Sequence, residues 1–505
     1  GPTLHLVRSV EGNVNLAFAG IGAMMSGQLE PVLVRLSETP NPKSLFSYLE
    51  KLEVINADVI VEDSTSEQTW VTPDVDIKLR KSTGRIDAET SFLVDMDNAV
   101  ADVSFIAGYD DATKRIDAGI SFSHIMPAVL GRLTSELEFL KYANIPVHGT
   151  LMLAASVKGK LESIGFDLVG EAGQIHLPAP LEGTLKANNF ILNGIYDAQA
   201  GRLEVDALYA ELAEDQQIML PSLISHPYPI TDFSFSGAYV SSQERIEINK
   251  LDINLGGRLA HINGAVDDIL NLPRGKIIVD IPELTVAEAA LYWPSSIGED
   301  AYKWFMSNVL SGTGNNLHTE IEGGVTESGE FEVSRIVGGF DINDASILYM
   351  DTMPPITDVN AVATFNHDQF DMSIASSQSH GMNLGTGKVL LTALSGDHEK
   401  IEIRTSMKGP FQKAMELINL EPMVFASEIG IDPEKVDGET RVELAFDFPL
   451  KESVEWEEVK FSADALVEKV NIPGGLFDLD VNDGMLNLAI DNSGMDIKGH
   501  MLLNN

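Results

Sequence analysis

The stretch RVELAFDF, residues 441–448, alternates apolar and polar side chains through its whole length. Successive side chains of a β-strand point to opposite faces, so a period of two places all apolar residues of this stretch on one face. That face would hold Val442, Leu444, Phe446 and Phe448. The other face would hold Glu443, Ala445 and Asp447. The stretch therefore predicts a strand that is apolar on one side only.

The same alternation recurs in two further stretches of the chain. RIEINKLDINL, residues 245–255, contains Ile246 and Ile248, and then Leu251, Ile253 and Leu255. MLNLAID, residues 485–491, contains Leu486, Leu488 and Ile490. Turn-forming residues separate such stretches every eight to twelve residues, which is typical of antiparallel strands joined by hairpins. Apolar faces of this extent must meet either another sheet, as in a sandwich core, or an apolar ligand.

Composition narrows the class of protein. The 505 residues include 44% hydrophobic ones, which excludes wholesale disorder. The 76 acidic and 34 basic residues give a formal charge of −42, so the chain repels phosphate backbones and nucleic acid is not expected as a partner. No apolar run approaches the roughly 18 residues of a membrane helix. The start Gly1-Pro2 resembles a protease-cleavage scar, and we expect a fragment of a longer protein.

Four helical inserts are expected between the strands, at residues 42–52, 123–142, 285–312 and 411–430. The last two are split by Pro294 and Pro422. So few helices argue against parallel strands, because each parallel crossover needs a helix of its own. Taking the inserts as boundaries, we expect four β units at residues 1–122, 123–284, 285–410 and 411–505, the last of them truncated.

The sequence contains no pattern typical of a catalytic or metal site. It has no cysteine, no G-x-S-x-G, no H-E-x-x-H and no P-loop. The acidic run at residues 478–484 has the spacing of a calcium loop, but Asp483 and Ala489 stand where glycine and glutamate are needed. We expect no enzyme activity, no cofactor and no metal.

Two segments carry a resemblance to a known family. Residues 290–324, ALYWPSSIGEDAYKWFMSNVLSGTGNNLHTEIEGG, resemble a helical segment of the YhdP-like branch of the bacterial AsmA-like proteins. The matching positions are Tyr292, Trp293, Pro294, Trp304, Asn308 and Gly312. Residues 345–365 resemble a second segment of that branch, through Tyr349, Pro354 and Pro355.

The resemblance implies a long antiparallel β-sheet, curved like a taco around an apolar groove, that lies in the periplasm of a Gram-negative bacterium. It implies one N-terminal helix in the inner membrane, absent from this chain, phospholipid as cargo, and further envelope proteins at either end. The twelve apolar residues of the three stretches above are then expected to line the groove. A scaffold with a dry core and an envelope enzyme are the alternative functions.

The insert at residues 285–312 is expected to cap the groove or cover its edge, because its apolar side chains avoid water. The residues assigned to this cap are Val286, Leu291, Tyr292, Trp293, Pro294, Trp304, Phe305 and Leu310.

Overall fold

The computed structural model describes residues 2–9, 14–19, 27–43, 45–64, 68–95, 100–131, 135–177, 183–218, 227–293, 299–329, 331–350, 352–396, 398–421, 424–428, 430–451, 454–476 and 479–504. Strands account for 69% of the chain, which confirms the mainly β class. Inter-residue contacts divide the chain into two compact units. Unit 1 comprises Gly1–Met219, Pro227–Gly257 and Asn263–Pro273, and unit 2 consists chiefly of Arg274–Asn505 together with Arg258–Ile262. The four-unit division expected from the inserts stays a prediction.

The sheet of unit 1 runs through consecutive hydrogen-bonded neighbours in the order β3, β2, β1, β4, β5, β6, β7, β8, β10, β11, β13, β14, β17 and β18. Every neighbouring pair is antiparallel except β1 and β4, which are parallel. The strands are β1 (Thr3–Arg8), β2 (Val14–Ala19), β3 (Gly27–Gln28), β4 (Lys51–Asp63), β5 (Gln68–Ser82), β6 (Arg85–Asp95), β7 (Val100–Asp110), β8 (Arg115–Ile125), β10 (Val147–Ser156), β11 (Leu161–Gly170), β13 (Gly183–Asp197), β14 (Arg202–Leu212), β17 (Asp232–Val240) and β18 (Arg245–Leu255).

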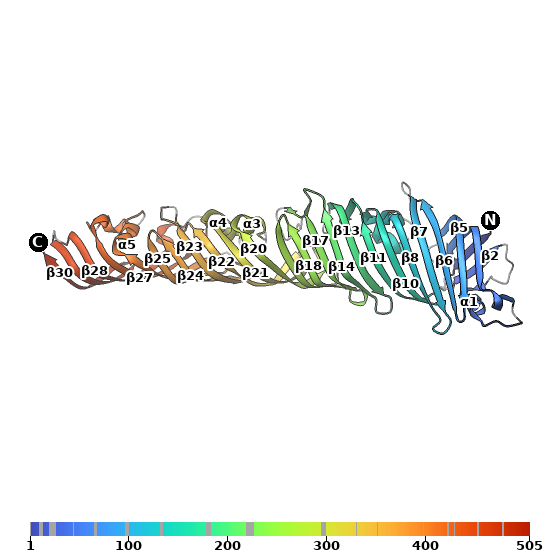
Figure 1. Ribbon diagram of the computed structural model, residues 1–505. Helices are drawn as coiled ribbons and strands as arrows, with labels where there is room; N and C mark the ends of the chain where they lie inside the picture. The colour runs from blue at the N-terminus through green and yellow to red at the C-terminus, as the bar shows by residue number, and fades with distance from the viewer. Residues whose placement is uncertain are drawn as a thin grey trace. The chain divides into compact units, whose positions relative to one another are not determined.

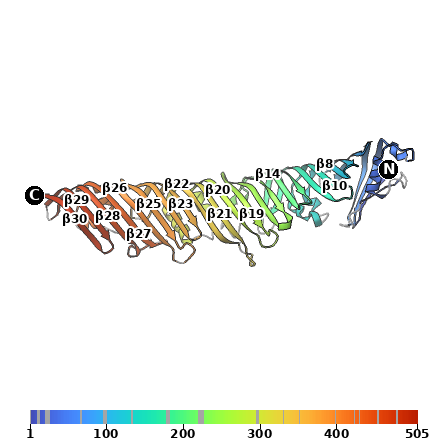
Figure 2. The same cartoon turned by 90° about the horizontal axis from the view of Figure 1, so that it is seen from below.

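Unit 2 continues the same plan with strands that are neighbours in both sequence and space, from β20 to β30. Figure 2 shows these strands side by side, each slanted in the same direction. They are β20 (Arg274–Thr285), β21 (Val309–Val325), β22 (Phe331–Ile347), β23 (Ile356–Asn366), β24 (Gln369–Ser379), β25 (Met382–Thr392), β26 (Lys400–Pro410), β27 (Asp437–Pro449), β28 (Lys460–Leu476), β29 (Leu479–Asp491) and β30 (Gly494–Asn504). Among the described residues, no ladder joins β20 to β30 or β3 to β18, so neither sheet closes on itself.

The two edges of each sheet differ in how the strands are connected. At the edge we call the turn edge, hairpins such as residues 111–114, 241–244 and 367–368 join the strands. At the opposite edge, the insert edge, lie the helical connections: α2 (Pro127–Leu130) with η3 (Ser135–Tyr142), α3 (Val286–Leu291) with α4 (Glu299–Asn308), and α5 (Phe411–Ile418) with α6 (Phe425–Glu428). Figure 1 shows α3, α4 and α5 along a single margin of the unit 2 strands. Short segments also fill the insert edge of unit 1, namely β9 (Ala143–Asn144), β12 (Gly173–Leu177), β15 (Gln217–Ile218) and β16 (Tyr228–Pro229).

Two of the four expected helices are much shorter than predicted. The first is only a 3-10 turn, η2 (Leu45–Tyr48), because Lys51 and Leu52 already belong to strand β4. In the second, β8 extends to Ile125 and the helical part is reduced to α2 and the 3-10 segment η3. A further helix, α1 (Leu29–Ser37), was not expected. The third and fourth inserts are interrupted helix pairs as predicted, although Pro294 and Pro422 lie outside the described residues.

Candidate functional site

One face of the unit 2 sheet is apolar from strand to strand, and the backbone register shows this directly. Residues opposite each other on adjacent strands point to the same face, so consecutive partners form a row across the sheet. One such row is Phe365, Phe370, Leu391, Ile401 and Phe448, from β23 to β27. The adjacent row is Ala363, Met372, Val389, Ile403, Phe446 and Phe461, from β23 to β28. We call this side of each sheet the apolar face.

The residues predicted on β27 and β29 all lie in these rows or in rows beside them. Leu444 is paired with Thr405 on one side and Ala463 on the other, and Ala463 with Ile490. Val442 lies opposite Ala465, which in turn is paired with Leu488. Leu486 is paired with Val467. The ring centroids of Phe446 and Phe461 lie 6.5 Å apart. Both predicted stretches therefore contribute to a single surface.

In unit 1 the same kind of surface depends on a β-bulge in β18. Ile246 and Ile248 are two residues apart, and so are Leu251 and Ile253, but the two pairs are out of phase in sequence. The register shifts opposite Ser236 and Gly237, so that Ile248 lies opposite Gly237 and Leu251 opposite Phe235. One extra residue in a bulge returns the following side chains to the original face. The first four predicted residues of β18 thus share a face, and Leu255 continues the spacing of Leu251 and Ile253.

The rows of unit 1 cross more strands than those of unit 2. One row runs Ala107, Ala118, Leu153, Ile164, Tyr196, Leu203, Tyr239 and Ile246, from β7 to β18. A second runs Val103, Phe122, Gly149, Leu168, Leu192, Leu208, Phe235 and Leu251 across the same strands. Neither row contains a charged residue. Within this unit the apolar face is continuous from β7 to β18.

The apolar face is only half covered. Of the twelve predicted residues, Leu486 alone is buried, at 7% exposure, and the others are half-buried. In a sandwich the facing side chains of two sheets interdigitate and become fully buried. Half-burial fits a sheet whose apolar side chains touch their row neighbours but no second sheet. The open, mainly antiparallel sheets are therefore consistent with a curved, groove-like fold.

Glycines on the apolar face are covered by aromatic rings from neighbouring positions. A Cβ atom added to Gly237 would lie 2.8 Å from the ring of Phe235 and 2.1 Å from the carbonyl oxygen of Glu247. At Gly194 the added Cβ would lie 2.8 Å from the ring of Phe166. The missing side chains give these rings room to lie against the sheet.

The outer face carries a repeated charge pattern that the sequence predictions missed. Five strands that begin at the turn edge open with a basic residue, an aliphatic residue and an acidic residue, namely at Arg85–Asp87, Arg115–Asp117, Arg202–Glu204, Arg245–Glu247 and Lys400–Glu402. The aliphatic residue belongs to the apolar face, as Leu203 and Ile246 do. The charged ones pair on the outer face, with Arg85 Nε 2.8 Å from Asp87 Oδ1 and Arg115 Nε 2.9 Å from Asp117 Oδ1. The repeat is visible in the sequence as [RK]-[IL]-[DE] at the start of these five strands.

The insert at α3 and α4 packs at the insert edge, next to β20 and β21. Thr285 caps α3 in a capping box with Glu288, and Arg258 Nε lies 2.6 Å from Glu288 Oε1. The ring of Trp293 is 5.4 Å from that of Phe305, which joins the two helices. Burial raises the pKa of Tyr292.

The other residues assigned to the cap differ in exposure. Val286, Trp304 and Phe305 are half-buried. Leu310 is 55% exposed and lies in strand β21, which begins at Val309, and not in the helices. Leu291, at 37% exposure, is also in contact with water. Pro294 lies outside the described residues.

The fourth insert, with α5 and α6, covers the apolar face at the insert edge of β27 to β29. Phe411 and Met415 of α5 are buried together with Val467, Val470 and Leu486 of the sheet. On the polar side of α5, Glu416 forms two ion-pair contacts. Its Oε2 lies 2.6 Å from Nε2 of His380 and 2.7 Å from Nζ of Lys413. The hydrogen bonds from Lys413 and His380 lower the pKa of Glu416.

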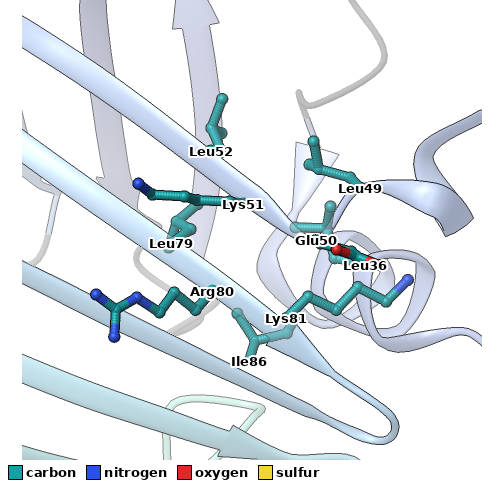
Figure 3. A pocket seen from close by; sticks show the side chains of 9 residues that line it. All are labelled: Leu36, Leu49, Glu50, Lys51, Leu52, Leu79, Arg80, Lys81 and Ile86. Atoms are coloured by element: carbon teal, nitrogen blue, oxygen red, sulfur yellow. The ribbon is translucent and has the colours of Figure 1, made fainter.

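The described residues contain no group of three or more side chains that could hold a metal ion. No helix in the described part of the chain is long and apolar enough to span a bilayer. A small pocket lies under α1, where Leu36, Leu49, Leu52, Leu79 and Ile86 come together (Figure 3). Lys81 Nζ closes one side by donating a hydrogen bond to the Ser47 carbonyl oxygen, at 2.9 Å. This pocket is the packing contact of α1 with β4 to β6.

Comparison with known proteins agrees with this geometry. The profile of the YhdP protein family matches residues 129–504, which include both segments whose resemblance is described above. No curated protein and no solved structure matches the chain. YhdP proteins are bacterial envelope proteins associated with lipid transport and are not known as enzymes. Since the match covers most of its length, the chain belongs to the YhdP family.

Proposed function

We propose that this protein is a conduit that carries the acyl chains of phospholipids along its apolar face, through the periplasm, between the inner and outer membranes of a Gram-negative bacterium. The observation that carries the proposal is the continuity of the apolar rows from β7 to β18 and from β23 to β28. The full-length protein would be anchored in the inner membrane by an N-terminal helix, with other envelope proteins at either end.

The energetics of such a surface suit transport. Burial of each methylene group stabilises a lipid by about 0.8 kcal/mol, whether it is buried in a bilayer or against an apolar sheet. Transfer from one to the other is then close to neutral, and a lipid is not trapped. Because every row offers similar side chains, the lipid can slide from strand to strand. The headgroup can stay in water, so no charged binding site is required.

A charge on the apolar face tests the proposal. The variant Leu444→Asp places a carboxylate in the row between Thr405 and Ala463, where it would have to be desolvated by passing acyl chains. We expect it to block lipid transfer between donor and acceptor membranes in cells. The matched control is Ala445→Asp, one residue away on the outer face, which should transport normally.

Lipid occupancy separates a conduit from a scaffold. Native mass spectrometry of the purified protein should detect bound phospholipid, and a photo-crosslinker at Phe446 should capture it. The scaffold function would be supported instead by three results together: the purified protein carries no lipid, the crosslinker captures none, and the Leu444→Asp variant supports normal envelope function.

A further inference from the structure

The apolar face of unit 1 is packed unequally along the strands. Toward the insert edge its side chains are buried, in a cluster of Ile145, Val147, Leu185, Ala187, Leu212 and Ile230. Ile145 comes from the α2–η3 insert region and Ile230 from the connection between β14 and β17, so these connections fold over the ends of the strands. Phe233, near the insert end of β17, packs against this cluster. The insert edge of unit 1 is therefore closed by the protein itself.

Toward the turn edge of β11 to β18 the same face stays half-buried, whereas Val157, directly after β10, is buried with Val32 and Leu36 of α1. The row residues there are Ile164, Tyr196, Leu203, Tyr239 and Ile246. None of them belongs to the buried cluster at the insert edge. The connections on this side, such as residues 198–201 and 241–244, are too short to fold over the strands.

Unit 2 repeats this asymmetry around a different insert. At the insert edge α5 buries Val467, Val470 and Leu486, and Leu417 packs with Met353 and Met382. The hydroxyl of Thr352 donates a hydrogen bond to the carbonyl oxygen of Glu421, at 2.6 Å, which ties two insert-edge connections together. Toward the turn edge, Leu391, Ile403, Phe446, Phe448, Phe461 and Ile490 are half-buried. Some residues on this side are buried as well: Ile336, Met372, Ile401 and Ala463 in the strands, and Leu450 and Val459 in the connection between β27 and β28.

From this asymmetry we infer that, between β11 and β18 and between β23 and β28, the lipid path is a strip of the apolar face beside the turn edge, that headgroups leave over that edge, and that the inserts seal the opposite edge. The inference rests on the proposed function and specifies it. In unit 1 the strip spans two rows, which contain Tyr239 and Gly237 on β17. The next row, that of Phe235, includes Phe122 and Leu168, which pack against the insert-edge cluster. Rows lie about 7 Å apart along a strand, so the two rows can hold the two chains of one phospholipid side by side.

Two aromatic residues of β17 provide a matched test of the strip. Tyr239 lies near the turn edge and Phe233 near the insert edge, and both are half-buried on the apolar face. Each is replaced by p-benzoylphenylalanine in the full-length protein, in cells, and crosslinked lipid is measured by mass spectrometry. We expect several-fold more lipid on the Tyr239 variant. Equal capture at both sites, or more at Phe233, would overturn the strip while leaving the conduit intact, whereas no capture at either site would count against the conduit itself.

The position of the headgroup is tested with single cysteines, which the chain otherwise lacks. Ser241→Cys lies in the turn between β17 and β18, and Glu214→Cys lies in the connection that follows β14 at the insert edge. Each is labelled with a fluorophore and mixed with vesicles of phosphatidylethanolamine that carries a quencher on its headgroup. We expect stronger quenching at Ser241. Stronger or equal quenching at Glu214 would mean that headgroups do not leave over the turn edge.

Discussion

The two faces of each sheet are formed by the same strands, but they differ in what holds their side chains. On the apolar face each residue contacts row neighbours on both adjacent strands, so a change at one position disturbs several strands. On the outer face most contacts are exposed ion pairs, which are screened by water and salt. The surface proposed to carry lipid is therefore also the surface that stabilises the sheet. Substitutions at neighbouring positions of one strand should therefore change the stability of the protein more on the apolar face than on the outer face.

The outer face is not uniformly polar. In unit 1, Ile106 and Met152 are exposed there, at 61% and 64%, and both are paired with Gly119. Met152 is also opposite Gly165. These side chains lie beside glycines, so they have few row neighbours. An apolar residue alone does not make an apolar face, which requires apolar partners on both adjacent strands.

The largest difference between the faces is expected at glycines. Gly237→Ala on the apolar face would force the new Cβ against Phe235 and the backbone of Glu247, at the 2.8 and 2.1 Å given above. We expect a loss of about 3 kcal/mol from overpacking, seen as faster hydrogen exchange of the β17 and β18 amides.

Gly165→Ala on the outer face is the control for this glycine prediction. Its added Cβ would lie 3.7 Å from Met152 Cβ, an ordinary contact. The alanine should be neutral or stabilise by up to about 1 kcal/mol, because it reduces the freedom of the unfolded chain. Equal protection of the β17 amides in both variants would contradict the difference between the faces.

Truncation of an aromatic side chain gives the next largest effect. Phe446→Ala removes a ring that packs with Phe461 and lies opposite Ile403. Because Phe446 is half-buried, we expect a cost of about 2 kcal/mol, below the range for a fully buried phenylalanine. Asp447→Ala, its neighbour on the outer face, should change little. Urea denaturation followed by hydrogen exchange in β26 to β28 measures both, and similar losses would show that the faces contribute equally.

The strands and their apolar faces could be predicted from the sequence, but the rows could not. Alternation around Leu444 and Leu488 fixes which residues share a face of one strand. The match between strands depends on register, which bulges alter: Asn249 is the extra residue that keeps Ile248 and Leu251 on the same face. The helix expected at residues 42–52 was wrong because Leu45, Leu49 and Leu52 have helical spacing while Leu52 also starts the alternation of β4. Burial at the insert edge depends on long-range packing, such as Phe411 on Val467, that no local pattern encodes.

Acidification should weaken the seal at α5 before it affects the strip. The lowered pKa of Glu416 means that its charged form is stabilised in the folded protein. Its contribution is therefore fully present above the unfolded pKa of about 4.3 and is lost as the pH falls through the lower folded value. Hydrogen exchange of the α5 amides should rise as the pH falls through this range, and Glu416→Gln should remove the pH dependence. If hydrogen exchange of the α5 amides depends on pH equally in the wild type and in Glu416→Gln, the Glu416 carboxylate is not the cause.

The smallest effect is expected from the ion pairs of the outer face at the turn edge. Arg202 Nη2 lies 2.9 Å from Glu247 Oε2, and these two residues belong to β14 and β18, with β17 between them. Arg202→Gln keeps the length of the side chain and removes its charge, so the change isolates the electrostatic part of the contact. Because both side chains are solvated, we expect a small drop in the unfolding midpoint at low ionic strength that vanishes in about 1 M salt, where the Debye length is about 3 Å. Lipid capture at Tyr239 should be unchanged, since Leu203 and not Arg202 belongs to the apolar row. Loss of lipid capture in Arg202→Gln would instead mean that this outer charge helps to bind the headgroup. At the turn edge, lipid binding would then depend on both faces of the sheet and not on the apolar face alone.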